Sequence, residues 1–203
     1  MTRSTARSVP RLPFPRSAAL LAVALALSAC NDLPKRPGST VETVSSARLE
    51  KKNPVDVVVA PVENATGRKG VPVAALREAF QDGLVKRRYS PLALEYVDRK
   101  VVNAAYRPGL LQEEAVLQVV IEGWDDSLWE SRGAITVKAR ARMLDAEDPA
   151  AGQLWVGSVD HRFDFGSKQD QLISADARLR FACDQIAAEI LAALPARNPA
   201  AGG

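Results

Sequence analysis

The 203-residue sequence has few of the residues from which most active sites are built, with one histidine, His161, and two cysteines, Cys30 and Cys183. A Ser-His-Asp triad, a Cys-His pair or a histidine-ligated metal site would have to be built around His161. The chain has no Gly-x-Ser-x-Gly elbow, no P-loop and no dinucleotide-binding fingerprint. We therefore predict a protein that is not an enzyme and that holds no metal or cofactor.

Positive charge is also scarcer than the totals suggest. The chain has 27 Lys and Arg against 24 Asp and Glu, but residues 1–29 contain four Arg and no acidic residue. Without that segment, 23 cations remain against 24 acidic residues, which leaves no basic footprint for a phosphate backbone. We therefore expect no nucleic-acid partner.

The first 29 residues have the pattern of a secretory signal. The four Arg precede an apolar run that begins near Ala18 and ends in small residues, as in a cleaved signal peptide. The run closes with Leu27-Ser28-Ala29-Cys30, which resembles the lipobox of bacterial lipoproteins. The resemblance implies that the signal is cut before Cys30, which becomes the lipid attachment site and membrane anchor. The alternative is an ordinary secretory signal followed by a chance cysteine.

Polar, proline-containing stretches flank one folded region. Their composition predicts a lipidated flexible tether at residues 30–53, with a short helix near residues 44–51 as an open alternative within it, and a disordered tail at residues 195–203. Residues 54–194 are long enough for a single domain with a hydrophobic core. Asn31 after Cys30, in place of Asp, favours the outer membrane under the enterobacterial sorting rule, so we expect the domain on the periplasmic face of that membrane.

Hydrophobic periodicity predicts an α/β (α+β) fold with a single mixed sheet of about five strands and helices packed on it. A run of Val between two prolines is typical of a strand buried on both faces, and the first β-α-β unit favours a parallel pair. The expected order is β-α-β-α-β-β-β-α. The strands are predicted at 55–60, 89–96, 115–124, 134–144 and from Gly152 through Phe163, and the helices at 73–88, 97–105 and 171–194.

Charged side chains alternate with apolar ones on two of these strands. Lys138, Arg140 and Arg142 share one face of the strand at 134–144, and Asp160 and Asp164 share one face of the strand that follows. If the two strands are neighbours, the acids are placed to pair with the cations, which would help to set the register.

The two residue types with reactive side chains both fall on apolar patterns. Cys183 lies on the apolar stripe of the last helix, where a free cysteine behaves as a small core hydrophobe. His161 lies on the same strand face as Trp155 and Val159 and is expected near the rim of the core. The alternatives are a redox or nucleophilic Cys183 and an enzyme centred on His161.

Trp124 and Trp129 flank the connection between the strands at 115–124 and 134–144. One of the two is expected in the core. The other interpretation is an interaction surface, because exposed tryptophan supplies a large contact area at a low entropy cost.

A polar loop follows the first predicted strand and contains Glu63, Asn64 and Thr66. It leaves the carboxyl end of that strand, where many α/β sheets bind ligands. We therefore treat Glu63, Asn64 and Thr66 as a candidate loop for a ligand or a partner.

Three segments together resemble a known superfamily: Val57-Val-Val-Ala-Pro-Val-Glu-Asn-Ala-Thr66, the helix at 75–84, and Gly152-Gln-Leu-Trp155. They are similar to a superfamily of bacterial lipoproteins that includes penicillin-binding-protein activators and the curli-export channel lipoprotein. The resemblance implies a small domain like the N-terminal domain of TolB. No segment has the alternation and length of an export β-barrel, so a channel is not expected.

These observations lead to one functional hypothesis and one alternative. The hypothesis is a non-enzymatic, lipid-anchored accessory or scaffold in envelope assembly or in peptidoglycan synthase regulation, which acts by contact with envelope proteins. The alternative is a ligand-binding auxiliary lipoprotein of a lipid or solute transport system, with its pocket at Asn64.

Overall fold

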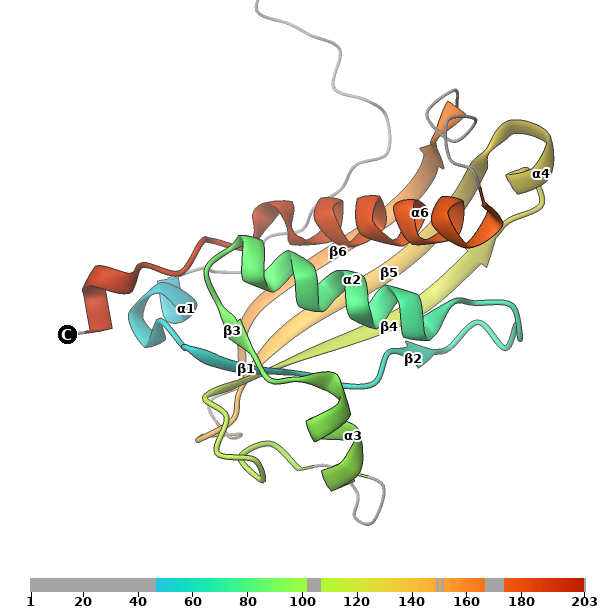
Figure 1. The fold of residues 1–203 in the computed structure, drawn as a ribbon. Helices are drawn as coiled ribbons and strands as arrows, with labels where there is room; N and C mark the ends of the chain where they lie inside the picture. Colours follow the sequence, from blue (N-terminus) through green and yellow to red (C-terminus); the bar gives the residue numbers. More distant parts are fainter. Residues whose placement is uncertain (1–46, 102–106, 149, 151, 167–173, 203) are drawn as a thin grey trace, which may run out of the picture. The chain divides into compact units, whose positions relative to one another are not determined.

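A mixed six-stranded sheet organises the chain in the computed structural model, which describes residues 47–101, 107–148, 150, 152–166 and 174–202. The strand order is β3-β1-β4-β5-β6, and β2 pairs with β4 beside that path (Figure 1). The strands are β1 (Asp56–Val59), β2 (Glu63–Asn64), β3 (Ser90–Pro91), β4 (Ala115–Asp125), β5 (Ala134–Asp145) and β6 (Gln153–Asp164). The α/β class with one mixed sheet is confirmed.

Helices of very different lengths accompany this sheet. The two long ones, α2 (Val73–Lys86) and α6 (Ala175–Ile190), pack against each other and lie side by side over the same face of the sheet (Figure 1). The short ones are α1 (Ala47–Lys52), α3 (Leu94–Val101), α4 (Trp129–Arg132) and the 3-10 turns η2 (Leu191–Ala193) and η3 (Pro199–Gly202).

The first strand has the position that its sequence predicts. Val57, Val58 and Val59 have no exposed surface, and β1 pairs in parallel with β3 on one side and β4 on the other. The predicted parallel β-α-β unit is therefore confirmed.

The strand predicted at 89–96 is wrong beyond its first residues. Only Ser90–Pro91 pairs with β1, and α3 already begins at Leu94. The Ser90 and Leu92 N–H groups donate to the Val55 and Val57 carbonyls over 2.9 and 3.0 Å, so the N atom of Pro91 faces the outer side of β3, as is usual for proline in an edge strand. The chain leaves the sheet after Leu92 and enters α3. The two-residue strand β2 was not predicted, because its burial pattern is exposed throughout.

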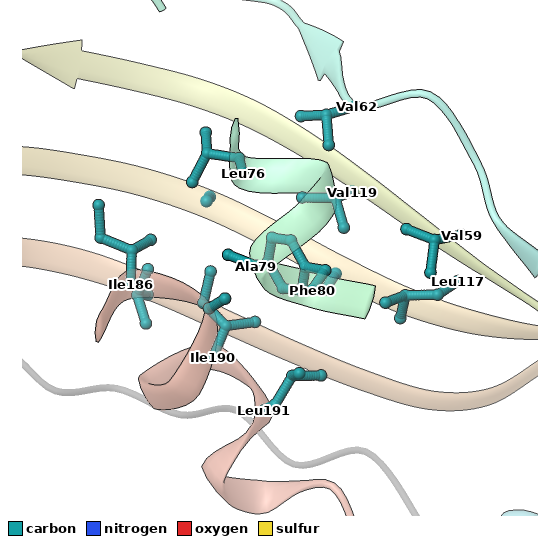
Figure 2. Packing of buried hydrophobic residues seen from close by; sticks show 14 of the residues in the cluster. Val59, Val62, Leu76, Ala79, Phe80, Leu117, Val119, Ile186, Ile190 and Leu191 are labelled. Carbon is teal, nitrogen blue, oxygen red and sulfur yellow. The ribbon is translucent and has the colours of Figure 1, made fainter. Parts of the chain in front are cut away.

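The three long strands form an antiparallel meander, β4-β5-β6, in which successive residues alternate between two faces. We call the side covered by α2 and α6 the core face. It carries Ile135, Val137 and Met143 of β5, all buried, and it meets the apolar stripes of the two helices. Figure 2 shows Leu76, Ala79 and Phe80 of α2 and Ile186 and Ile190 of α6 in the layer between the helices and the sheet, in the same cluster as Leu117 and Val119 of β4.

Within the described residues, the opposite side of the sheet is covered only in part. A small second cluster packs Val58 of β1 and Val116 of β4 against Val97 of α3. Farther along the strands, this side of β4–β6 carries Glu122, Lys138, Arg140, Asp160 and Arg162, and we call it the open face. The Lys138 and Arg140 side chains on it are 53% and 58% exposed, so they project into solvent.

Both predicted flanking segments are partly folded into the domain. Residues 47–53, assigned to the tether, contain α1, whose Leu49 is 1% exposed in the core. Lys52 at the end of α1 bonds to Asp145 over 2.9 Å and to Glu147 over 2.5 Å. These bonds outweigh the effect of burial, which alone would lower the pKa of Lys52, so that its pKa is raised.

The C-terminal tail is likewise bonded to the domain. The Tyr89 hydroxyl donates to the Pro195 carbonyl over 2.9 Å, and the Arg197 N–H donates to the Arg87 carbonyl over 2.9 Å. Asn198 and Asn53 exchange two hydrogen bonds of 2.7 and 3.1 Å. At residues 195–198 the prediction of a disordered tail is therefore wrong, because three residues of that segment bond to parts of the domain that are distant in sequence.

Candidate functional site

The predicted lipid attachment residue, Cys30, lies outside the described residues, as do the signal peptide and most of the tether. The anchor therefore stays a prediction from the sequence. Within the described residues, the structure has no helix of the length and apolar character that crossing a membrane requires.

The loop around Asn64 uses its polar groups to hold its own turn. The Asn64 amide donates to the Arg68 carbonyl over 2.6 Å, and its oxygen accepts from the N–H and the hydroxyl of Thr66 over 3.1 and 2.6 Å. The Thr66 hydroxyl oxygen accepts from the Arg68 N–H over 3.0 Å. This arrangement is a side-chain-stabilised turn, in which asparagine and threonine replace backbone bonds. The Asn64 and Thr66 side chains are thus engaged in the turn itself.

Arg68, which the sequence analysis did not single out, connects this loop to the end of β4. Its guanidinium donates to the Trp124 carbonyl over 2.5 Å and lies 3.3 Å from Asp126 and 4.0 Å from Asp125. The Ser127 backbone N–H, which bonds to the Asp125 carboxylate over 3.0 Å, is the main cause of a lowered pKa at Asp125, and Arg68 adds to the shift. In the sequence, the only indication of this connection is that Arg68 follows Asn64 by four residues and that two acids, Asp125 and Asp126, follow Trp124.

Glu63 does not share the turn made by the other two loop residues, Asn64 and Thr66, and lies beside a groove instead. It is exposed, and it lines a shallow groove of about 220 Å³ together with Gln118 and Arg142 on the open side of the sheet. The groove carries one acid and one cation and is too small for a drug-sized ligand, which needs roughly 300 Å³ or more.

Trp124 is not available as a contact surface. It is 5% exposed and belongs to the core cluster, so that part of the interaction-surface prediction is wrong. The cause is a β-bulge between Ile121 and Gly123, where Glu122 is the extra residue. Strict alternation from Ile121 would have placed Trp124 on the open face, and the extra residue turns it to the core face instead.

Trp129 lies in α4 and is half-buried at the end of the sheet. Its ring meets Phe165 edge-on at 6.1 Å, and Phe165 in turn contacts Phe163 and Phe181 at the same centroid distance. Edge-to-face geometry of this kind stabilises aromatic packing. Trp124 is therefore the tryptophan of the pair that lies in the core, as expected. Trp129 packs at the edge of an aromatic cluster formed with Phe163, Phe165 and Phe181.

His161 contacts a carboxylate and a ring. Its Nε2 lies 3.3 Å from Glu189 of α6, its ring stacks on Phe163 at 4.3 Å, and its side chain is 15% exposed. Within the described residues, Nδ1 is buried and has no hydrogen-bond partner. The position at the rim of the core matches the prediction, and the group next to Nε2 is the Glu189 carboxylate.

Cys183 is fully buried on the inner side of α6. Burial raises the pKa of its thiol to about 12, and the neighbouring Asp184 adds to the shift. Because the thiolate is the reactive form, the thiol is inert near neutral pH. Its placement as a core residue is confirmed.

Two arrangements of charge were not foreseen. On the open face, Asp160 of β6 lies directly across from Lys138, as predicted, but the ion pairs of Lys138 and Arg140 in the described residues are with Glu122 of β4, at 3.5 and 3.7 Å. In α2, Arg77 is 8% exposed, donates to the Val59 carbonyl over 3.0 Å and pairs with Asp98 of α3 at 2.5 Å.

Among the described residues, no cluster of three or more His, Cys, Asp or Glu is arranged to hold a metal ion.

Comparison with known proteins finds structural likeness at low sequence identity. No family model matches the chain, and no curated protein matches it. The PelC dodecamer from Paraburkholderia phytofirmans is 16% identical over 79% of this chain and 99% of that one, with a TM-score of 0.49. Lipoprotein GNA1162 from Neisseria meningitidis is 20% identical over 66% and 97%, with a TM-score of 0.46. A DUF4136 family protein from Bacteroides thetaiotaomicron is 13% identical over 78% and 98%, with a TM-score of 0.42.

These three matches have identities of 20% or less and TM-scores under 0.5, so no property of those proteins is assigned to this chain. The resemblance to penicillin-binding-protein activators also stays a prediction, since none of these comparisons confirms it.

Proposed function

We propose that this protein is a lipid-anchored protein of the bacterial envelope, held on the periplasmic face of the outer membrane, whose domain acts as an accessory or scaffold through contacts with other envelope proteins. The anchor is supported by Leu27-Ser28-Ala29-Cys30 at the end of an apolar run, and Asn31 favours the outer membrane. Acyl chains contribute about 0.8 kcal/mol for each buried methylene group, so several chains on one cysteine hold a protein stably on a membrane.

The observation that carries the contact function is the open face of β4–β6. An antiparallel sheet with helices on one side presents a rigid surface on the other, and here that surface bears Glu122, Lys138, Arg140, Asp160 and Arg162. Charges of both signs on a rigid surface favour a specific protein partner, because complementary charges steer association and exclude wrong partners. We propose that these contacts serve envelope assembly or the regulation of a peptidoglycan synthase.

The residue chemistry supports a contact function more than the alternative of solute binding. The Asn64 and Thr66 side chains bond within their own turn, and the groove beside Glu63 is small. The buried, protonated Cys183 and the His161–Glu189 pair are likewise part of the packed domain.

The anchor is tested by labelling cells that produce the full chain with radioactive palmitate. The parent protein should carry label and sediment with outer-membrane fractions, and Cys30→Ser should lose both properties. An unlabelled parent, or a Cys30→Ser protein that fractionates like the parent, would refute the anchor.

The contact surface is tested separately by placing a photoreactive amino acid at Arg140 on the open face or at Val85 on α2, which is 57% exposed. We expect a discrete crosslinked product in the envelope from position 140 and none from position 85. Equal products from both positions, or none from position 140, would refute the open face as the contact surface.

A further inference from the structure

The outer edge of β6 has no strand beside it in the described part of the chain. The strand is 12 residues long, roughly 40 Å, and its pairing is with β5 alone. At the other end of the strand order, the edge strand β3 has only two residues. A long edge presents a row of N–H and C=O groups that can pair with a further strand.

The charges along this edge repeat with alternating sign. Asp160, Arg162 and Asp164 are all exposed on the open face, and Arg162 and Asp164 are 3.6 Å apart, 39% and 63% exposed. That contact is in solvent, where an ion pair is weak and its members are free to exchange partners. On the core face of the same segment, Val159 and Phe163 are already covered by the core.

From these observations we infer that the outer edge of β6 pairs antiparallel with β6 of a second copy of this chain. The charge pattern points to a second copy as the occupant: an acid-cation-acid pattern on alternate residues complements an antiparallel copy of itself when the two copies are offset so that each cation faces an acid. A two-fold axis perpendicular to the sheet keeps the open faces of both copies on the same side, so open-face residues meet each other.

The alternation also selects the register. If His161 lies opposite its own counterpart, Asp160 of each copy faces Arg162 of the other, which gives two ion pairs. If Phe163 lies opposite its counterpart, Arg162 faces Asp164, again twice. A register centred on Arg162 would place two cations opposite each other, and a register centred on Asp160 would oppose two acids, and like charges directly across a strand pair are destabilising.

This inference goes beyond the proposed function, and the lipid anchor is compatible with it. In an antiparallel pair the two α1 helices, which contact β6, lie toward opposite ends of the joined sheets. Sixteen residues separate Cys30 from Ala47, a reach of up to roughly 55 Å when extended. Both anchors can therefore reach one leaflet, and confinement to a membrane raises the effective concentration of each copy for the other.

The test is a charge exchange, measured by sedimentation of the full-length protein purified in detergent. We expect the parent to be a dimer. One variant carries Arg162→Asp alone, and a second carries both Asp160→Arg and Asp164→Arg. Each variant should raise the dimer dissociation constant by about tenfold or more. A one-to-one mixture of the two variants should form a heterodimer, which also shows that both remain folded. Arg140→Asp is the matched control, since Arg140 shares the open face but lies on the inner strand β5, and it should leave the dimer intact.

A disulfide test reads the register directly. Asp160→Cys combined with Arg162→Cys should crosslink two copies in the register centred on His161, and Arg162→Cys combined with Asp164→Cys in the register centred on Phe163. A parent that stays monomeric, a dimer indifferent to every charge exchange, or a dimer that neither cysteine pair crosslinks would overturn the inference. Because the measurement is made in detergent, its failure is distinct from a failure of palmitate labelling.

Discussion

Gly157 of β6 lies against the end of α6, and replacing it with alanine tests how tightly the two are packed. A Cβ at this position would lie 2.5 and 2.6 Å from two ring atoms of Trp155 and 2.9 Å from the Ile190 carbonyl oxygen. Trp155 is fully buried, and its Nε1–H donates to the Ala193 carbonyl over 3.3 Å. The ring cannot swing away without losing that bond, and the carbonyl belongs to the end of a helix.

Two opposing contributions decide the magnitude for Gly157→Ala. Alanine relieves the entropic cost of a glycine within a strand, worth up to about 1 kcal/mol. Overpacking a filled core costs about 1–3 kcal/mol, and the upper value applies here because a ring and a backbone carbonyl must both move. We therefore expect the free energy of unfolding to fall by about 2 kcal/mol, which lowers Tm by about 4–8 °C in a domain of this size.

Thermal and urea unfolding, followed by circular dichroism on the full-length protein in detergent, measure this change. Gly70→Ala is the matched control, because nothing lies within 4 Å of a Cβ at Gly70, and it should leave Tm unchanged or slightly raised. In the Gly157→Ala background, Trp155→Phe should cost less than it does alone, since it removes part of the clash. A Gly157→Ala protein as stable as the parent, or strictly additive penalties in the double variant, would refute the packing argument.

Two further predictions concern the thiol and the tail. Because burial raises the pKa of Cys183 from 9.0 to about 12, the unfolded chain loses that proton first as pH rises, and the free energy of unfolding falls above pH 9 by up to about 1.4 kcal/mol for each pH unit. Urea unfolding at about pH 8 and about pH 10.5 should show a smaller fall for Cys183→Ala than for the parent, and equal falls would contradict the assignment. Ending the chain at Leu194 removes the four hydrogen bonds made by Pro195, Arg197 and Asn198, each worth about 0.5–1.5 kcal/mol, with the exposed Asn53–Asn198 pair at the low end, so urea unfolding should show a loss of about 2–4 kcal/mol. No loss on truncation would mean that the tail contributes nothing to the fold.

Much of the fold could be predicted because its signals are local. The alternation over Ala134–Leu144 and the Val run at 55–60 each determine which faces are buried, whatever lies beside them, and β5 and β1 appear there. The helical stripe of Leu76, Phe80 and Leu84 likewise needs no knowledge of its partner, and all three are fully buried in α2.

The parts that sequence reasoning missed depend on contacts between distant residues. The Asn53–Asn198 pair joins residues 145 positions apart, so neither a Pro-rich tail nor a polar segment near Asn53 shows by composition that it is held. The bulge at Glu122 depends on how β4 meets β5, and it reverses the face of Trp124 although the local pattern does not change. Such features arise from the pairing of two segments, and periodicity in one segment does not contain them.

The candidate site was hard to predict because the sequence does not show which hydrogen bonds each polar group already makes within the fold. Asn64 and Thr66 have the side chains of a ligand-binding loop, but both bond within their own turn, and His161 meets Glu189. Residue type shows what a group is able to bind, whereas only the fold shows whether that capacity is already in use. In this domain exposed charge remains on the open face and along the outer edge of β6, at Arg140 and Arg162 among others, and a partner has most to gain by docking there.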